Sequence, residues 1–397
     1  MAREAVREDF DLIIIGGGPG GLAAGIYGGR AKLKTLILEK GTVGGRAHTT
    51  REIVNYPGTP SISGPALSEE MKGHAMGFGV DIRTQAVKSV DFSGQDKIVK
   101  TKRGEYHAPA VILATGTSAR ILGIPGEKEY TGMGVGYCAT CDAEFFQDQE
   151  VVVVGSGDQA IEEGMYITKF ASRVTVVVLH DEGILDCNKQ AAEKALAHPK
   201  MNFIWNSVLD EILGDGNEVT GVRIKNEKTG ELSDFTCQGV FFFVGMVPET
   251  EFVKGQIELD NKGWIHTNEM METSVEGVYA VGDVREKYLR QVATAVSDGA
   301  IAATAAERYI EEQQDFKHNV LESSIPVILA FWSPEVDQSL EAMTAARAEA
   351  LKSGEACRFM EIDITRKKGL ARTYGVVLDQ EHPAVCVKIV DGTAVTQ

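Results

Sequence analysis

The sequence is poor in cysteine, in basic side chains relative to acidic ones, and in long apolar runs. Its 397 residues include six cysteines, too few for a disulfide-stapled scaffold. Lys and Arg number 40 against 57 Asp and Glu, and the net charge of -17 disfavours a nucleic-acid partner, because neutralising phosphates requires clustered basic side chains. No apolar run approaches the ~18 residues of a membrane span, and the charged opening segment MAREAVREDF lacks the apolar core of a signal peptide. These absences predict a cytoplasmic protein without a membrane partner.

Glycine is abundant instead, with 43 residues, and the first glycine-rich segment stands between an apolar strand and a helix. Residues 12–15 are wholly apolar, as in a strand buried on both faces of a parallel sheet. A helix is expected at 22–30 and a second strand at 35–38, which ends in Glu39. The turn carries G-x-G-x-x-G at Gly16, Gly18 and Gly21. In this motif the first glycine permits a tight turn, the second lets a pyrophosphate approach the backbone, and the third allows close helix packing. This unit predicts a dinucleotide site in which Glu39 accepts a ribose hydroxyl.

A second unit repeats the pattern after a strand at 151–154, with G-x-G-x-x-A at Gly155, Gly157 and Ala160. Glu39 follows Gly21 by eighteen residues, but the residue eighteen after Ala160 is Val178, neither an acid for a ribose hydroxyl nor an arginine for a 2′-phosphate. The next polar residues are His180, Asp181 and Glu182. The negative charge of a 2′-phosphate beside two acids would be poorly compensated, so NADPH is disfavoured. If NADH is the donor, Asp181 or Glu182 is the expected ribose contact.

The two units are interleaved along the chain. Residues 110–115 are expected to form a strand that closes the first fold, and residues 277–282 form another much later, ending in Gly282-Asp283. A helix is expected at 292–312, followed by a polar connector at 313–324. The length fits about two to three domains, so we expect an α/β protein in which the first nucleotide fold is split by the second and a smaller unit follows.

Cys138 and Cys141 form the one C-x-x-C of the sequence, and Asp142 follows directly. Near βαβ units this spacing is typical of a dithiol/disulfide redox pair. The alternative is half of a zinc site, but the other four cysteines are solitary and no histidine stands near them at ligand spacing, so no metal is predicted. Asp142 is a candidate proton donor or acceptor for a leaving thiolate, or a helix N-terminal acid that complements the dipole.

Taken together, these motifs resemble those of low-molecular-weight, flavin-dependent thioredoxin reductases, the class II pyridine nucleotide-disulfide oxidoreductases. GGGPGG, ATGTSAR, CATCD and GDVREKYLRQVATAVSDG occur in the family's order at 16–21, 114–120, 138–142 and 282–299. The resemblance implies two Rossmann-like domains: an FAD domain at 1–121 and 249–316, and an NAD(P)-like domain at 122–248 that carries the C-x-x-C. It also implies a homodimer and a large rotation between the domains during turnover.

The resemblance also implies roles for individual residues. FAD would be held by Gly16, Gly18, Gly21, Glu39, Gly45, Arg46, Asn55, Thr115, Gly116, Asp283, Arg290 and Gln291. The reduced flavin would open a Cys138–Cys141 disulfide with Cys141 nearer the ring, while Asp142 manages the proton. Cys138 would then attack the disulfide of a thioredoxin-like partner, and Cys141 would resolve the mixed disulfide.

The chain departs from the family pattern in three ways. The family's HRRxxxR segment, which binds the NADPH phosphate, aligns with 178–184, where every basic residue except His180 is absent. The donor is then expected to be NADH, or a ferredoxin-like or other unusual donor. The basic residues at 366–368 and Arg372 form a candidate patch for an acidic protein such as ferredoxin. Arg46 replaces the usual glutamine and adds a cation near FAD.

The third departure is a tail at 322–397 that resembles a thioredoxin fold without its catalytic cysteines, since 333–339 replaces the C-x-x-C after Phe331-Trp332. This tail is a candidate for docking a partner, regulating the dithiol site or extending the dimer surface. It also motivates a rival of another class, a flavoprotein that senses redox state or scaffolds a partner.

Overall fold

The computed structural model describes residues 6–50, 53–352 and 356–395. The chain divides into two compact units, Met1–Thr304 and Ala305–Gln397, and α7 (Val292–Phe316) runs through the division. None of the helices in the described ranges is long and apolar enough to cross a membrane.

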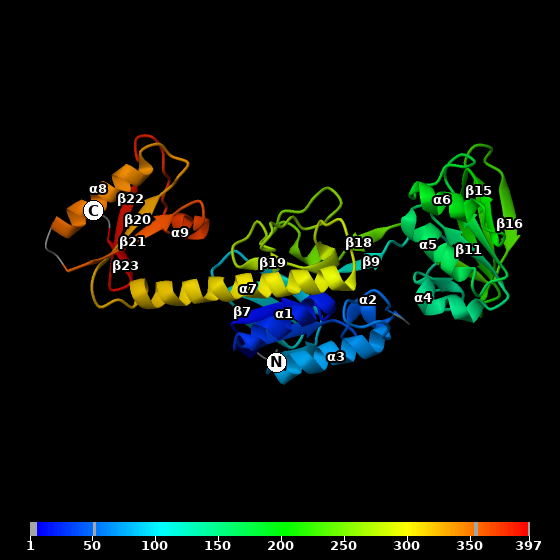
Figure 1. The fold of residues 1–397 in the computed structure, drawn as a ribbon, viewed down its shortest axis with the longest axis horizontal. Coiled ribbons are helices and arrows are strands. Elements are labelled where there is room, and N and C mark those ends of the chain that lie inside the picture. The colour runs from blue at the N-terminus through cyan, green and yellow to red at the C-terminus, as the bar shows by residue number, and fades with distance from the viewer. Residues whose placement is uncertain (1–5, 51–52, 353–355, 396–397) are drawn as a thin grey trace, which may run out of the picture. The chain divides into compact units, whose positions relative to one another are not determined.

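A five-stranded parallel sheet forms the centre of the first nucleotide fold (Figure 1). Its strands are fully buried except at one edge, where residues 81–84 are partly exposed, and α1 (Pro19–Arg30) contacts α3 (Gly64–Gly77) beside it. The order is β19 (Val278–Ala280), β8 (Ala110–Leu113), β2 (Leu12–Ile15), β3 (Thr35–Glu39) and β4 (Asp81–Thr84). Because β19 pairs with β8 after more than a hundred intervening residues, the structure has the interleaved connectivity that the sequence predicts for these strands.

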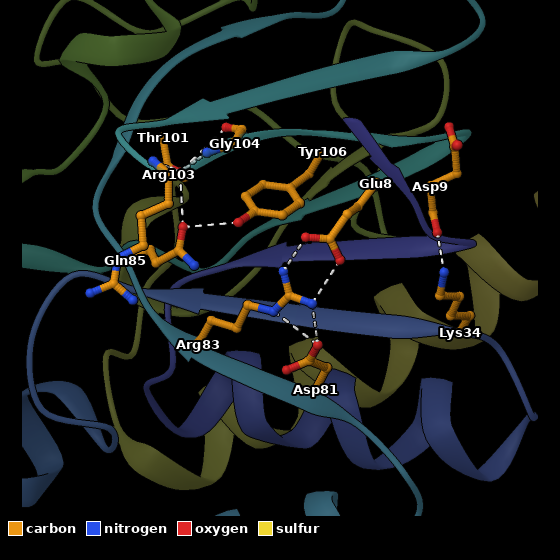
Figure 2. A network of polar contacts seen from close by, with 10 residues as sticks. All are labelled: Glu8, Asp9, Lys34, Asp81, Arg83, Gln85, Thr101, Arg103, Gly104 and Tyr106. Carbon is orange, nitrogen blue, oxygen red and sulfur yellow. Dashed lines mark hydrogen bonds and ion pairs between the residues drawn. The ribbon is translucent and has the colours of Figure 1, made fainter. Parts of the chain in front are cut away.

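A second, four-stranded sheet packs with the first, in the order β1 (Val6–Asp9), β7 (Gly104–Ala108), β6 (Lys97–Thr101) and β5 (Val87–Asp91). A polar network ties the two sheets together (Figure 2). Arg83 of β4 donates to both carboxylate oxygens of Glu8, at 2.8 and 2.9 Å, and to Asp81. These hydrogen bonds lower the pKa of Glu8. Gln85 accepts hydrogen bonds from the hydroxyls of Tyr106 and Thr101, so the end of β4 is fixed against β6 and β7.

The second nucleotide fold has its own parallel sheet, packed with short helices. The strand order is β10 (Val135–Gly136), β17 (Gly239–Phe242), β11 (Glu150–Val154), β12 (Arg173–Val177) and β13 (Met201–Ile204). Its helices are α4 (Ala139–Asp142), η1 (Ala143–Phe146), α5 (Asp158–Ile167) and α6 (Lys189–Leu196). An antiparallel sheet of β14 (Ser207–Gly214), β15 (Val219–Asn226) and β16 (Leu232–Thr236) covers one face, where its apolar side chains join those of β11 and β17.

The chain passes between the two nucleotide folds twice, and the two passes pair with each other. β9 (Thr117–Ala119) runs antiparallel to β18 (Met246–Pro248). Short helical turns follow at η2 (Glu251–Val253) and η3 (Gly282–Val284).

The C-terminal unit is built on a mixed sheet. A π-helical turn at Lys317–Leu321 follows α7, and the sheet order is β21 (Arg358–Asp363), β20 (Val327–Trp332), β22 (Val385–Val390) and β23 (Thr393–Val395). β20 is parallel to β21 and antiparallel to β22. The connecting helices are α8 (Ser339–Lys352) and α9 (Lys368–Thr373). Val327, Leu329, Phe331 and Ile389 form the core of this unit.

Candidate functional site

Each nucleotide fold has a glycine turn that leaves no room for a side chain at its first glycine. Gly16 has φ 110°, and a Cβ there would lie 2.3 Å from the carbonyl oxygen of Ala114. Gly155 has φ 119°, and its Cβ would lie 2.4 Å from the carbonyl oxygen of Phe243. Both clashes are with backbone of the neighbouring strand end, so only glycine lets the chain turn here.

The second glycine of each turn lies open. A Cβ on Gly18 or on Gly157 would meet nothing within 4 Å. Gly18 caps the N-terminus of α1 and Gly157 caps that of α5, where backbone N–H groups lack helical acceptors and the helix dipole favours an anion. An open backbone and free amides at a helix N-terminus are the features that a pyrophosphate requires, so both turns fit a dinucleotide.

Glu39 is held against the first glycine turn. It is 8% exposed, its Oε2 accepts a hydrogen bond from the Gly17 N–H at 2.7 Å, and its Oε1 accepts one from the Gly41 N–H at 2.8 Å. The turn also meets α2 (Gly45–His48), because a Cβ on Gly45 would lie 3.3 Å from the Cα of Gly18. The carboxylate thus lies beside the open backbone, where its predicted role as a ribose acceptor is geometrically available.

Arg46 and Asp283 bring opposite charges to the first fold. Desolvation lowers the pKa of Arg46, and the charge of Asp283 opposes that shift. Burial raises the pKa of Asp283, while Lys287, Arg46 and Arg290 act in the opposite direction. Arg46 Nη1 lies 3.5 Å from the hydroxyl of Thr117 and makes no ion pair within the described residues. The Asp283 carboxylate likewise accepts no hydrogen bond within the described ranges, which suits a ligand that carries hydroxyl groups, as FAD does.

The remaining residues expected around FAD are brought together in pairs. Asn55 Nδ2 donates to Gln291 Oε1 at 3.1 Å, although 236 positions separate the two residues. The Arg290 guanidinium lies 3.8 Å from the centroid of the Trp264 ring and donates through Nε to the carbonyl oxygen of Asp283 at 3.4 Å. Arg290 is therefore fixed beside Asp283.

Thr115 and Gly116 lie at the end of β8 and contact the chain where it returns from the second fold. Thr115 Oγ1 donates to the carbonyl oxygen of Glu249 at 2.8 Å, and the Glu249 N–H donates to the carbonyl oxygen of Gly116 at 3.0 Å. Gly116 has φ 65°, which explains glycine at this turn.

The C-x-x-C stands at the start of α4. Cys138 is disulfide-bonded and occupies the N-cap position, and the Asp142 N–H donates to its carbonyl oxygen at 3.3 Å. The side chain of Cys141 lies outside the part of the chain that the structure describes. Burial raises the pKa of the Asp142 carboxyl, which is half-buried on the same helix.

The free thiols of the described residues are Cys187, Cys237, Cys357 and Cys386. Within the described residues, no group of three or more His, Cys, Asp or Glu side chains is placed to hold a metal ion.

In the second fold, the loop after β12 places its acids differently from the expectation. Val178, at the position where a ribose acid is usual, is fully buried. Asp181 forms an ion pair with Lys228. Asp186, which the spacing argument does not reach, accepts hydrogen bonds from the hydroxyl of Ser156 at 2.7 Å and from His180 Nε2 at 2.8 Å. Sequence reasoning therefore missed Asp186, the acid that contacts this turn. It lies eight positions beyond Val178, and the folded loop brings its side chain to the glycine turn.

Comparison with known proteins places the chain in a family. Residues 10–299 match the family Pyridine nucleotide-disulphide oxidoreductase. Thioredoxin reductase from Peptoclostridium litorale is 50% identical over 310 residues, covering 76% of this chain and 98% of the relative. Thioredoxin reductase from Bacillus subtilis (strain 168) is 44% identical over 306 residues, covering 77% of this chain and 96% of the relative. The crystal structure of Lactococcus lactis thioredoxin reductase (FR conformation) is 43% identical with a TM-score of 0.69, covering 76% of this chain and 99% of that one. The chain therefore belongs to the pyridine nucleotide-disulphide oxidoreductases and, within them, to the thioredoxin reductases, FAD-dependent enzymes that reduce a disulfide.

Proposed function

We propose that this protein passes electrons from NADH, or from another donor that is not NADPH, through FAD and a Cys138–Cys141 disulfide to a thioredoxin-like protein. The observation that carries the proposal is the disulfide-bonded Cys138 at the start of α4, with the half-buried carboxyl of Asp142 on the same helix. When bound, FAD supplies the electron pair that opens this disulfide.

The chain's own residues account for the exchange that follows. The Cys138 thiolate attacks the disulfide of the partner, which breaks the partner's S–S bond and forms a mixed disulfide. The Cys141 thiolate then attacks the Cys138 sulfur, so that the chain's disulfide re-forms and the partner leaves as a dithiol. Two electrons pass to the partner, and two protons accompany them. Asp142 holds or donates a proton at the leaving sulfur, because its raised pKa keeps the carboxyl protonated at higher pH than an exposed aspartate.

The residues of the first fold fit FAD. Gly16, Gly18 and Gly21 with the N-terminus of α1 would hold the pyrophosphate, and Glu39 the adenosine ribose. Asp283 would accept hydroxyl groups of the cofactor, with Asn55, Gln291, Arg290, Thr115, Gly116, Gly45 and Arg46 as further contacts. Their mutual hydrogen bonds fix these groups before any ligand arrives, which lowers the entropic cost of binding.

What the second fold retains supports the proposed electron donor. Gly155, Gly157 and Ala160 keep a turn that a dinucleotide pyrophosphate fits, and 178–184 lacks the arginines that a 2′-phosphate needs. Both features favour NADH.

A ferredoxin-dependent flavin thioredoxin reductase is the second candidate. Its proposed basic patch is weakened by local pairing, since Lys367 pairs with Glu312 and Arg366 lies 3.7 Å from Asp363. The rival of another class, a redox sensor or scaffold, leaves the C-x-x-C without a turnover role.

For the C-terminal unit we propose a degenerate thioredoxin-like domain at 322–397. The support is its order of elements, a parallel β-α-β pair (β20, α8, β21) followed by α9 and two antiparallel strands, together with Ser333 and Glu335 at the place where a C-x-x-C would follow β20. We further propose a homodimer acting in the cytoplasm, with domains that rotate during turnover, as the family resemblance implies.

Replacement of Asp142 with Asn should slow transfer between flavin and disulfide by about 10²-fold, because the proton carrier is lost. The raised pKa of Asp142 also means that folding favours its protonated form. Ionisation of Asp142 therefore lowers the stability of the native state as the pH rises above the ordinary pKa of an aspartate. The variant should accordingly unfold at the same temperature as the wild type or higher at pH 7. Asp148→Asn, at an exposed residue with φ 58° that Asn tolerates, is the matched control. Stopped-flow absorbance measures the rates, and an unchanged rate in the Asp142 variant contradicts the assignment.

The experiment that tests the proposed function is anaerobic bleaching of the flavin absorbance on mixing with NADH, NADPH or reduced ferredoxin, followed by addition of oxidised thioredoxin. We expect rapid bleaching by NADH and recovery of the absorbance when thioredoxin is added, over repeated cycles. Recovery that needs no thioredoxin, or one that occurs only once, would favour the sensor. Bleaching by reduced ferredoxin alone would overturn NADH as the donor and favour the ferredoxin-dependent flavin thioredoxin reductase.

A further inference from the structure

In each of the two glycine turns of this chain, an acid accepts a hydrogen bond from the residue between the first two glycines. In the first fold, Gly17 lies between the first two glycines of the motif, and its N–H donates to Glu39 Oε2 at 2.7 Å. In the second fold, Ser156 takes the position of Gly17, and its hydroxyl donates to Asp186 Oδ2, also at 2.7 Å. Glu39 comes from the end of a strand and Asp186 from a loop, yet both carboxylates contact the residue that precedes the open glycine.

Asp186 is held in place and still has an oxygen to offer. Ser156 is 7% exposed and fixed, His180 Nε2 lies 2.8 Å from the same Oδ2, and the backbones of Gly157 and Asp186 form a parallel bridge. The hydrogen bond from Ser156, and then that from His180, lower the pKa of Asp186, so the group is a carboxylate at neutral pH. Its side chain is 58% exposed, and within the described residues Oδ1 accepts no hydrogen bond.

The carboxylate stands beside the phosphate-binding backbone and does not cover it. A Cβ on Gly157 would meet nothing within 4 Å, so Asp186 leaves the approach of a pyrophosphate clear. In dinucleotide folds the acid beside this turn accepts the hydroxyls of the adenosine ribose.

Two other acids of the second fold have different partners. Asp158 accepts hydrogen bonds from the backbone and side-chain nitrogens of Asn188, at 2.7 and 2.9 Å, and Asp181 pairs with Lys228. The hydroxyl of Ser156, between the first two glycines of the turn, donates to Asp186 instead.

We infer that Asp186 is the residue that selects the nucleotide in the second fold: its carboxylate accepts the adenosine ribose hydroxyls of NADH and repels the 2′-phosphate of NADPH. The inference rests on the proposed function, because it names the donor that the second fold serves. A 2′-phosphate would bring further negative charge against Asp186, and the neighbouring imidazole of His180 is already hydrogen-bonded to that carboxylate. Selectivity thus comes from an attraction for one ligand and a repulsion of the other.

The test uses two probes that carry the ribose and pyrophosphate but no nicotinamide, ADP-ribose and 2′-phospho-ADP-ribose, which cannot reduce the flavin. Calorimetric titration of the full-length, FAD-loaded protein gives both dissociation constants. Asp186→Asn should weaken ADP-ribose by about tenfold, the loss of one charged hydrogen bond, and should leave 2′-phospho-ADP-ribose unchanged or bound more tightly. Asp148→Asn removes the same charge from an exposed residue of the same fold that is no candidate nucleotide contact, and should change either constant by less than about twofold. An unchanged ratio of flavin to protein absorbance shows that each variant is folded.

Three results overturn the inference: wild-type affinity of the Asp186 variant for ADP-ribose, an equal loss for both probes, or tighter wild-type binding of 2′-phospho-ADP-ribose. The proposed function is tested separately by reducing the flavin with dithionite and following transfer to oxidised thioredoxin. Transfer without the predicted nucleotide selectivity would refute the role of Asp186 and keep the reductase. Selectivity without transfer would refute the reductase and keep the role of Asp186.

Discussion

Replacing Cys138 with Ser should abolish the reduction of thioredoxin while the donor still bleaches the flavin. The proposed exchange begins with attack by the Cys138 thiolate, and a serine hydroxyl at neutral pH neither ionises nor forms a disulfide. We expect the rate of thioredoxin reduction to fall by at least about 10³-fold, because the variant removes the nucleophile itself. The rate of flavin bleaching should stay within about twofold of the wild type, since the glycine turns and the nucleotide loop are untouched.

Cys386→Ser is the control for this variant. Cys386 is an exposed free thiol in the C-terminal unit, so its replacement should leave both rates unchanged. A discontinuous thiol assay measures thioredoxin reduction, and stopped-flow absorbance measures bleaching. Thioredoxin reduction that survives in the Cys138 variant would sink the mechanism. A loss in the Cys386 variant would instead bring the C-terminal unit into the exchange.

The glycine turns could be predicted from sequence because their requirements are local. A positive φ at Gly16 and at Gly155, and a backbone clash for any Cβ, follow from how a strand must turn into a helix. The same reasoning predicts the buried strands at 12–15 and 151–154, which the structure confirms.

Contacts that depend on distant parts of the chain needed either the family resemblance or the fold. The hydrogen bond between Asn55 and Gln291 joins residues 236 positions apart, and no spacing rule predicts it. The electrostatic interaction of Arg46 with Asp283 also joins residues that are far apart in the sequence, and no spacing rule predicts it. Asp186 was missed because the rule for a ribose acid counts along a strand, whereas this carboxylate reaches the turn from a loop. Sequence patterns predict backbone shape well, but they predict side-chain partners only where the chain path is short.

Replacing Gly21 with Ala should cost the protein both stability and FAD, whereas replacing Gly18 with Ala should cost FAD alone. A Cβ on Gly21 would lie 1.9 Å from the carbonyl oxygen of Gly16, so α1 or the turn must move. Overpacking of this kind costs about 1–3 kcal/mol. Gly18 has φ -74° and ψ -178°, which any residue adopts, and its Cβ would meet nothing within 4 Å. Its methyl group would instead occupy the space through which a pyrophosphate approaches.

The two variants are separated by the unfolding temperature of the FAD-free protein. A ligand that binds only the native state adds RT ln(1 + [L]/Kd) to its stability, so a variant whose affinity alone is impaired differs from the wild type only when the ligand is present. FAD-free Gly18→Ala should therefore unfold at the temperature of the FAD-free wild type, and should fall below it when both are measured at the same FAD concentration. Gly21→Ala should unfold several degrees below the wild type with or without FAD, since the clash is present in both states.

The second fold supplies the matched control for Gly21. Ala160 occupies the corresponding position there and is fully buried, so the second turn accommodates a methyl group at this point. Ala160→Gly should therefore lower stability by about 1 kcal/mol through helix propensity and leave FAD content unchanged. Wild-type stability of Gly21→Ala would show that the first turn can widen to the geometry of the second. A Gly18→Ala variant that is destabilised in the absence of FAD would show that this glycine shapes the fold itself, and that the open backbone at Gly18 is not reserved for the cofactor.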